Sequence, residues 1–332
     1  MNKFVKKITA VALTAVMVGG LFAGCSSNAG KDADDNKSNE AKTYKVGICQ
    51  LVQHDALDAA TKGFKEALQA KLGDKVVIDE QNAGGDSATC STITNGYVAD
   101  GMDLIFANAT PALAAAMQST TTIPIVATSI TDFATALEIK DWKGTTGMNV
   151  TGTSDLAPLA DQAQMLKELC PDAKNVGILY CSAEPNSVYQ ANVVAAELKK
   201  LGIESKEYTA ADTNDIASVV QNACDNSDAL YIPTDNTMAS ATGTIEPIVS
   251  KAKIPVVTGE EGICKGCGIA TLSISYYSIG YKAGEMAAEI LTEGKDPAEM
   301  EIQFASDLTK KYVASRAKDA GITVPDDYEE IV

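Results

Sequence analysis

The chain has 332 residues, of which 45% are hydrophobic, and a net charge of −17 at neutral pH. This length suits two domains, each with its own core. The acidic balance disfavours binding to nucleic acid or to an anionic membrane surface. The single histidine, His54, excludes a catalytic or metal site that needs two histidines, and we expect neither a metal nor a cofactor.

Residues 1–24 are typical of a secretory signal, with three lysines, an apolar stretch and small residues before a cleavage point. Without them the chain carries −20, because those three lysines are their only charges. The segment 21–25 resembles a bacterial lipobox, which implies cleavage before Cys25 and a lipid on its sulfur. The alternative is an ordinary signal peptide with a chance cysteine. Residues 25–43 are poor in large apolar side chains and predict a flexible tether.

Strand and helix signals alternate from Tyr44 onward, which predicts parallel sheets covered on both faces. In the first half we expect strands over 45–49, 76–78, 104–106, 123–126 and 147–150, with helices after the loop 50–58, after the break 84–87 and from about 110.

The second half repeats this architecture without repeating the sequence. We expect helices over 156–169, 187–201, 216–224, 238–252, 278–291 and 311–320, and strands over 176–179, 204–208, 230–232, 255–257, 268–275 and 302–310. Gly280 and Gly284 predict a helix that packs closely on a sheet.

Three segments, 103–114, 176–188 and 229–240, each run from an apolar strand through a short polar turn into a helix. In open parallel sheets, ligands bind at the carboxyl ends of the strands, where these turns lie. The pattern therefore predicts a small-molecule site between two lobes that close on it.

Six segments together resemble substrate-binding proteins of the tryptophan/tyrosine-type ABC uptake family. They are spread in order over about residues 45–325, at 47–64, 109–112, 149–155, 186–190, 233–237 and 276–280. Two places depart from the family pattern, namely Asp55 and the turn 130–133.

The resemblance implies an α/β, periplasmic-binding-protein-like type I fold, each lobe being a parallel sheet flanked by helices. Three crossings would give an N-lobe of 44–154 plus 276–305 and a C-lobe of 155–275 plus 306–332. It also implies a monomeric, extracytoplasmic lipoprotein that delivers a small amino acid, with an aromatic one expected, to an ABC permease and its ATPase.

An amino acid needs one partner for its carboxylate and one for its ammonium group. Helix N-termini suit the carboxylate, with hydroxyls from Thr110, Ser129 and Ser187. Asp235 is our first candidate for the ammonium group, with Glu184 and Glu260 as second candidates. The structural alternatives are plain N-caps for the hydroxyls and a turn carboxylate for Asp235.

Further polar and aromatic candidates lie in the strand-end loops. These are Gln50, Gln53 and His54 in the first loop, Asn186 and Asn236 in the later ones, and Tyr276 next to a predicted crossing. The other aromatic candidates for a flat slot, Phe106, Tyr180, Tyr231 and Tyr277, are more typical of a core.

Among the cysteines, Cys264 and Cys267 form the one close pair, between two predicted strands, and indicate either a local disulfide or two free thiols. Cys49 and Cys181, at predicted strand ends, are placed to touch a ligand. No catalytic motif is present, so we expect no enzyme. The alternatives left open are a sensor that presents ligand to a receptor, a non-amino-acid ligand such as a nucleoside, and a hydrolase using a cleft serine.

Overall fold

The structure is a computed structural model that describes residues 42–332, which belong to one compact unit. The predicted signal peptide, Cys25 and the tether up to residue 41 lie outside the described residues. Among residues 42–332, no helix combines the length and the apolar character needed to cross a membrane.

The N-lobe is built on a six-stranded parallel sheet in the order β11-β5-β4-β3-β1-β2. Its strands are β1 (Tyr44–Gln50), β2 (Val76–Asn82), β3 (Leu104–Asn108), β4 (Ile125–Ile130), β5 (Val150–Ser154) and β11 (Gln303–Phe304). Its helices are α1 (Asp55–Leu72), α2 (Ser87–Ala99), α3 (Thr110–Ser119), α4 (Phe133–Ala136) and α11 (Tyr276–Glu293), with short 3-10 turns at Gly73–Lys75 and Pro297–Glu299.

The C-lobe is built on a seven-stranded sheet in the order β13-β12-β10-β9-β8-β6-β7, parallel except between β10 and β12. Its strands are β6 (Asn175–Cys181), β7 (Glu204–Ala210), β8 (Ala229–Ile232), β9 (Val256–Thr258), β10 (Ala270–Ser273), β12 (Thr309–Tyr312) and β13 (Glu329–Glu330). Its helices are α5 (Leu159–Leu169), α6 (Pro185–Lys200), α7 (Ile216–Asp225), α8 (Asn236–Ser240), α9 (Thr242–Ala252), α10 (Glu261–Cys267) and α12 (Ala314–Asp319).

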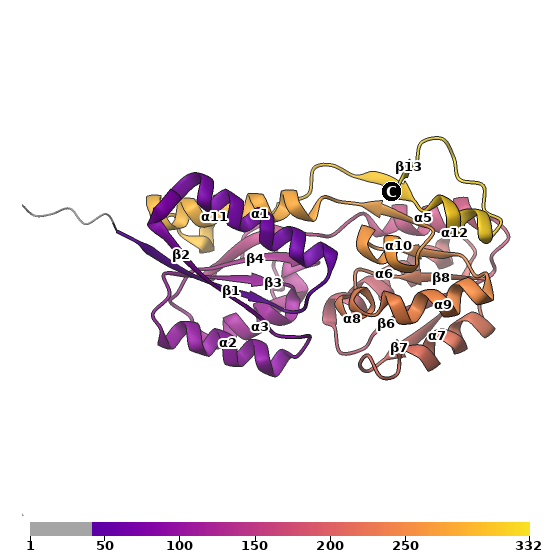
Figure 1. The fold of residues 1–332 in the computed structure, drawn as a ribbon, viewed down its shortest axis with the longest axis horizontal. Coiled ribbons are helices and arrows are strands. Elements are labelled where there is room, and N and C mark those ends of the chain that lie inside the picture. The colour runs from indigo at the N-terminus through magenta and orange to yellow at the C-terminus, as the bar shows by residue number, and fades with distance from the viewer. Residues whose placement is uncertain (1–41) are drawn as a thin grey trace, which may run out of the picture. The chain divides into compact units, whose positions relative to one another are not determined.

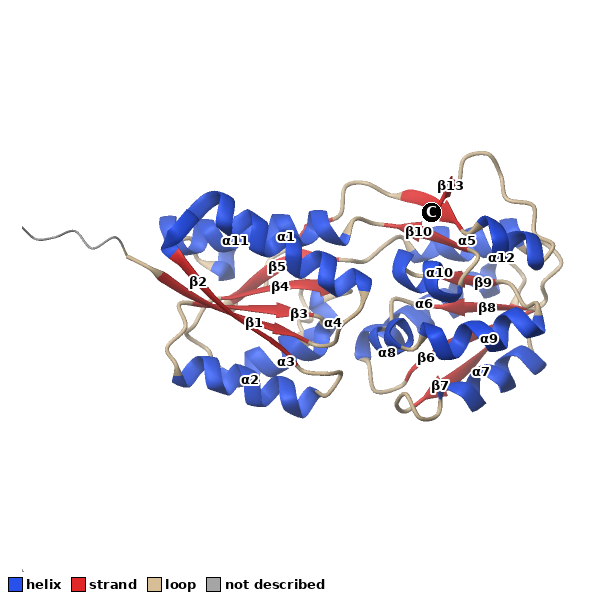
Figure 2. Cartoon of the chain, viewed as in Figure 1, coloured by secondary structure: helices blue, strands red, loops and turns tan. Residues whose placement is uncertain are grey.

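The predicted fold class is confirmed, since both sheets are flanked by helices and the chain changes sheet three times (Figure 2). The changes come after β5, after β10 and between β11 and β12. The residue bounds of the two lobes stay a prediction.

Side-chain alternation gives the N-lobe sheet two apolar faces. Phe106 on β3 stacks on Phe64 of α1 with ring centroids 3.7 Å apart, while the next residue, Ala107, belongs to the cluster on the opposite face. Figure 1 shows α1 and α11 on one face of this sheet and α2 and α3 on the other. Both faces need such cover because the central strands, such as β3 and β4, are buried on both sides.

Close packing of α1 against α11 depends on glycine. A methyl group at Gly280 would lie 2.0 Å from the Ala60 carbonyl oxygen, and one at Gly63 would lie 2.2 Å from the Tyr277 carbonyl oxygen. The two backbones therefore touch directly. The sequence predicted a close approach to a sheet, and this prediction was wrong about the partner, because Gly280 and Gly284 both face α1.

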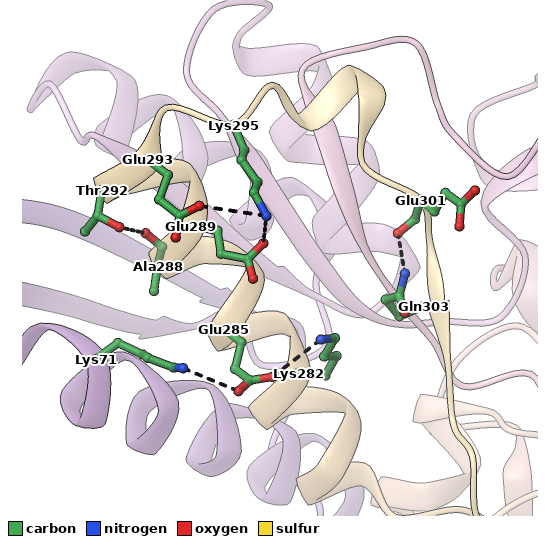
Figure 3. A network of polar contacts seen from close by, with 10 residues as sticks. All are labelled: Lys71, Lys282, Glu285, Ala288, Glu289, Thr292, Glu293, Lys295, Glu301 and Gln303. Carbon is green, nitrogen blue, oxygen red and sulfur yellow. Dashed lines mark hydrogen bonds and ion pairs between the residues drawn. The ribbon is translucent and has the colours of Figure 1, made fainter.

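Ion pairs lie on the solvent-exposed side of α1 and α11, as Figure 3 shows. Glu285 on α11 lies 3.7 Å from Lys71 of α1 and 3.5 Å from Lys282. The lysines are about half exposed, so each pair contributes roughly 0–1 kcal/mol. The apolar contacts beneath them therefore hold the helix pair together.

Three other elements differ from the sequence prediction. The helix expected over 238–252 is divided into α8 and α9, with Ala241 outside helical geometry between them. The segment around Cys264 and Cys267, expected between strands, forms α10. The strand expected over 302–310 is two short strands, β11 and β12, which belong to different sheets.

We predict that Gly280→Ala lowers the free energy of unfolding by about 1–3 kcal/mol, because the new methyl group must displace α1 backbone. Urea denaturation measures the change. Gly96→Ala in α2 is the matched control. Its methyl group meets open space, and the substitution should stabilise the protein by up to about 1 kcal/mol. A Gly280→Ala variant as stable as the wild type would contradict this account of the helix pair.

Candidate ligand-binding site

A small cavity lies between the two lobes where strands from both sheets end. Residues after β4, β5, β8 and β9 meet there with the first turns of α1, α6, α8 and α11. Its lining is His54, Leu57, Ser129, Thr131, Asp155, Asn186, Thr234, Asp235, Asn236, Ala239, Glu260 and Tyr276. This is the position at which open parallel sheets bind ligands.

Buried polar atoms without a partner concentrate in this cavity. Within residues 42–332, seven buried side-chain nitrogen or oxygen atoms have no hydrogen-bond partner. Four of them belong to cavity residues, namely His54 Nδ1, Ser129 Oγ, Asp155 Oδ1 and Asn186 Oδ1. Buried polar groups are nearly always paired, so a cluster of exceptions indicates a place where a ligand supplies the partners.

Four buried carboxyl groups surround the cavity, and three of them are occupied by backbone N–H groups. Asp235 accepts from the Cys181 N–H at 2.7 Å and from the Met238 N–H at 2.8 Å. Glu260 caps α10 by accepting from the Gly262 and Ile263 N–H groups. These acids neutralise helix N-termini, which is the usual role of a capping carboxylate.

Glu184 is the third occupied acid, and it does not line the cavity. Its two oxygens accept from the Asn236 and Thr237 N–H groups at 3.1 and 2.8 Å and from both side chains of that pair. It also accepts from Asn186 Nδ2 at 3.2 Å. Glu184 thus positions the start of α8 beside the start of α6, and all its acceptor sites face its own lobe.

Asp155 is the acid that remains available. Its Oδ2 accepts from the Tyr276 hydroxyl at 2.8 Å, whereas its Oδ1 has no partner. Burial raises the pKa of Asp155, and the Tyr276 and Thr131 hydroxyls offset only part of that rise. Thr131 does not reach hydrogen-bond geometry with the open oxygen. A cationic group beside Oδ1 would stabilise the ionised carboxylate.

Two more unpartnered acceptors belong to residues that line the cavity. Asn186 Nδ2 donates to Glu184 Oε2, Ser187 Oγ and the Thr234 carbonyl, which leaves its own Oδ1 as the inward atom. Burial lowers the pKa of His54, so its ring is neutral. Asn236 uses its Nδ2 on Glu184, hence its Oδ1 accepts from His54 Nε2 at 3.3 Å. His54 Nδ1 is then an unprotonated acceptor.

Besides the His54 acceptor, the N-lobe side of the cavity offers donors. Ser129, at the end of β4, holds a φ of +57°, a left-handed conformation that costs energy in a non-glycine residue, and its hydroxyl has no partner. His54 occupies the N-cap position of α1 without a side-chain capping bond. The positive end of this 18-residue helix therefore starts at the cavity wall.

Seven of the twelve predicted site residues line this cavity: His54, Ser129, Asn186, Asp235, Asn236, Glu260 and Tyr276. The others contact different parts of the fold. Gln50 bonds Asp58 and Thr61 inside the N-lobe, because its side chain turns toward α1. Thr110 and Ser187 are buried at the starts of α3 and α6, Gln53 lines a neighbouring cavity, and Glu184 holds the α8 start. The ligand role of each remains a prediction.

Sequence reasoning did not single out Asp155, Thr131 or Thr234. Asp155 directly follows β5, just as Asp235 lies shortly after β8, so its position at a strand end was the available signal.

Of the aromatic candidates, Tyr276 lines the cavity, whereas Phe106 and Tyr231 are core residues. All seven described cysteines are free thiols, which decides the question left open for Cys264 and Cys267. Cys49 lies in the core beside Cys90.

Comparison with known proteins gives consistent matches. Residues 45–330 match the model of the family described as ABC transporter substrate binding protein. The chain is 36% identical over 302 residues to a tyrosine-binding protein of Clostridioides difficile, covering 90% of this chain and 87% of that protein.

Two solved structures are similar over nearly the whole described chain. One is an ABC domain from Streptococcus pneumoniae in complex with L-Trp, 32% identical with a TM-score of 0.83. It covers 88% of this chain and all of that one. The other is a ligand-free, open substrate-binding protein with adhesive properties from Clostridium difficile, 33% identical with a TM-score of 0.66, covering 87% and 99%. The TM-score is higher with the ligand-bound structure than with the open one. This agrees with the hydrogen bond between His54 and Asn236, which joins the two lobes directly. The chain belongs to the ABC transporter substrate-binding protein family, as the resemblance of its strand-end segments implied.

Proposed function

We propose that this protein captures an amino acid outside the cytoplasm and delivers it to an ABC permease and its ATPase. The cavity chemistry carries the proposal. Asp155 Oδ1, Asn186 Oδ1 and His54 Nδ1 are three unpartnered acceptors around one cavity, and an ammonium group has three N–H donors. Within residues 42–332, no lysine or arginine lines this cavity to compete with the ligand for Asp155.

The ligand carboxylate fits the opposite wall. The Ser129 hydroxyl is an available donor, and the first turn of α1 provides the positive end of a helix dipole. An amino acid bound in this way would neutralise the Asp155 carboxylate and give hydrogen-bond partners to the four unpartnered polar atoms of the cavity. The names of the two similar proteins, one tyrosine-binding and one crystallised with L-Trp, favour an aromatic amino acid.

We propose that the protein binds this ligand without chemical turnover and as a monomer. Ser129 is the cavity serine with an unpartnered hydroxyl, so it forms no hydrogen bond to a base. The hydrogen bond of Asp155 goes to the Tyr276 hydroxyl and not to a serine. A catalytic serine needs such a partner.

Asp155→Asn should weaken amino-acid binding by about 10- to 150-fold, since a hydrogen bond to a charged group contributes roughly 1.5–3 kcal/mol. Titration calorimetry with L-tyrosine and L-tryptophan measures this. Asp235→Asn is the comparison: its carboxylate caps α8 and bonds β6, so we expect a lower melting temperature and a smaller change in Kd. Unchanged affinity in Asp155→Asn would remove Asp155 from the site.

The stability of the ligand-free protein should fall as pH rises from about 4.5 to 8. Burial raises the pKa of Glu260 to about 7 and that of Asp235 to about 8, and it raises the pKa of Asp155 as well. A carboxyl whose folded-state pKa exceeds its unfolded value stabilises the fold while protonated, and this contribution is lost as pH rises through the folded-state pKa.

Melting temperatures measured from pH 5 to pH 8 test this dependence. The ammonium group requires ionised Asp155, so the melting-temperature increase caused by L-tyrosine should be larger at pH 8 than at pH 5. In Asp155→Asn the ligand-dependent part of the pH profile should flatten, whereas the part due to Glu260 and Asp235 should persist. A ligand-free protein that is most stable at pH 8 would refute the assignment.

We further propose that a lipid on Cys25 anchors the protein to the outer face of the cell membrane. Cys25→Ser should shift the protein from the membrane fraction to the soluble extracytoplasmic fraction, as followed by immunoblotting. Cys224→Ser, at a half-buried cysteine of α7, is the control and should leave the distribution unchanged. Membrane retention of Cys25→Ser would show that another element provides the attachment.

A further inference from the structure

We propose that Cys49 and Cys90 form a disulfide bond in the exported protein and link the end of β1 to the first turn of α2. The structure holds both residues as thiols, and neither lines the ligand cavity. Only the location outside the cytoplasm, where disulfides form and persist, is taken from the proposed function.

The packing of α2 on β1 places these two residues opposite each other. Helix α2 connects β2 to β3, and both strands are parallel to β1, so the helix runs against the direction of β1. The Tyr97 ring of α2 covers Gly47 of β1, where an added methyl group would lie 2.6 Å from the ring. Cys90 lies two turns before Tyr97 on the same face of the helix. Cys49 lies two residues after Gly47 on the same face of the strand, which brings it beneath Cys90.

Backbone hydrogen bonds hold the two segments in this register. The loop before α2 runs beside the end of β1, where the Ala83 N–H donates to the Gln50 carbonyl at 2.9 Å. Two residues further on, the Gly85 N–H donates to the Leu51 carbonyl at 2.8 Å. The start of α2 is therefore fixed next to the residues that follow Cys49.

The two thiols are in contact inside the apolar core on this face of the sheet. Both side chains are fully buried, and the Cys49 thiol donates a hydrogen bond to the Cys90 sulfur. This hydrogen bond lowers the pKa of Cys90 and raises that of Cys49. The start of the 13-residue helix α2 also favours a thiolate at Cys90. Cys90 is therefore the nucleophile of the pair, and Cys49 is the thiol that reacts second.

The cysteine pair that is closest in sequence lacks this arrangement. Cys264 and Cys267 share helix α10, but the Cys267 thiol donates to the Ile263 carbonyl at 3.4 Å. In the described part of the chain, the direct thiol contact is found at Cys49 and Cys90 instead. Proximity in space, and not in sequence, therefore selects the pair.

Oxidation of the pair needs a small disulfide, such as oxidised glutathione. The Cys90 thiolate attacks one sulfur of the oxidant and releases one thiol, which leaves a mixed disulfide on Cys90. Cys49 then loses its proton and attacks the Cys90 sulfur, which forms the protein disulfide and releases the second thiol. The protein loses two electrons and two protons, and the oxidant gains them. Because both sulfurs are buried in the folded protein, we expect the bond to form while the chain folds after export.

Peptide mapping tests the proposal directly. The protein is purified after export, unfolded in the presence of an alkylating reagent and digested with trypsin. Cys49 and Cys90 lie in separate tryptic peptides, residues 46–62 and 76–140, which contain no other cysteine. We expect these peptides to be recovered joined and to separate on reduction, whereas Cys264 and Cys267 should be recovered alkylated.

Melting temperatures give a second, independent measure. The cross-link restricts the unfolded chain, so the oxidised protein should melt about 3–8 °C above protein that was unfolded, reduced and refolded in dithiothreitol. Cys90→Ala should remove this difference. Cys267→Ala, which removes a similarly buried sulfur from the other lobe, is the matched control and should keep the difference.

Three results would overturn the proposal: recovery of Cys49 and Cys90 as alkylated thiols, a disulfide between Cys264 and Cys267 in their place, or a difference in melting temperature that persists in Cys90→Ala. If Cys90→Ala does not fold, the peptide map of the wild type decides alone. Neither measurement involves a ligand, so the outcome is separate from that of amino-acid binding.

Discussion

The structure of the site depends on how buried carboxylates are matched to helix N-termini. Parallel strands deliver several helix starts to one place, and each start presents N–H groups without partners inside the helix. Asp235 and Glu260 satisfy the starts of α8 and α10 from within, and Glu184 satisfies two further N–H groups of α8. Because these acids are saturated, Asp155 is left as the open carboxylate at the cavity.

The N-lobe contribution to the site depends on a different constraint, the contact between α1 and α11. Both helices begin at the cavity, with His54 and Leu57 on the first and Tyr276 on the second. Gly63 and Gly280 bring the two backbones into contact, which fixes the relative positions of these helix starts. A bulkier residue at either glycine would move a cavity wall as well as weaken the core.

The sequence predicted the alternating strands and helices and the position of the site, because these follow from local apolar patterns and strand-end polarity. The three crossings were expected from the family resemblance. It could not tell Asp155 from Asp235. Both lie just after a strand, and only their tertiary partners differ: the Tyr276 hydroxyl in one case, the Cys181 N–H in the other. Helix α10 was missed because its seven residues include two cysteines and two glycines, and so short an apolar pattern does not distinguish a helix from a loop.

Ligand binding and lobe closure involve neighbouring groups, and the two ring nitrogens of His54 serve one each. In the described residues, His54 to Asn236 and Gln190 to Thr131 are side-chain hydrogen bonds between the lobes. The acceptors that fit an ammonium group come from both sides, His54 from the N-lobe and Asn186 from the C-lobe, with Asp155 at a crossing between them. A ligand that bonds all three contributes free energy only when the lobes are together, so its differential affinity for the closed form is what shifts the population toward closure.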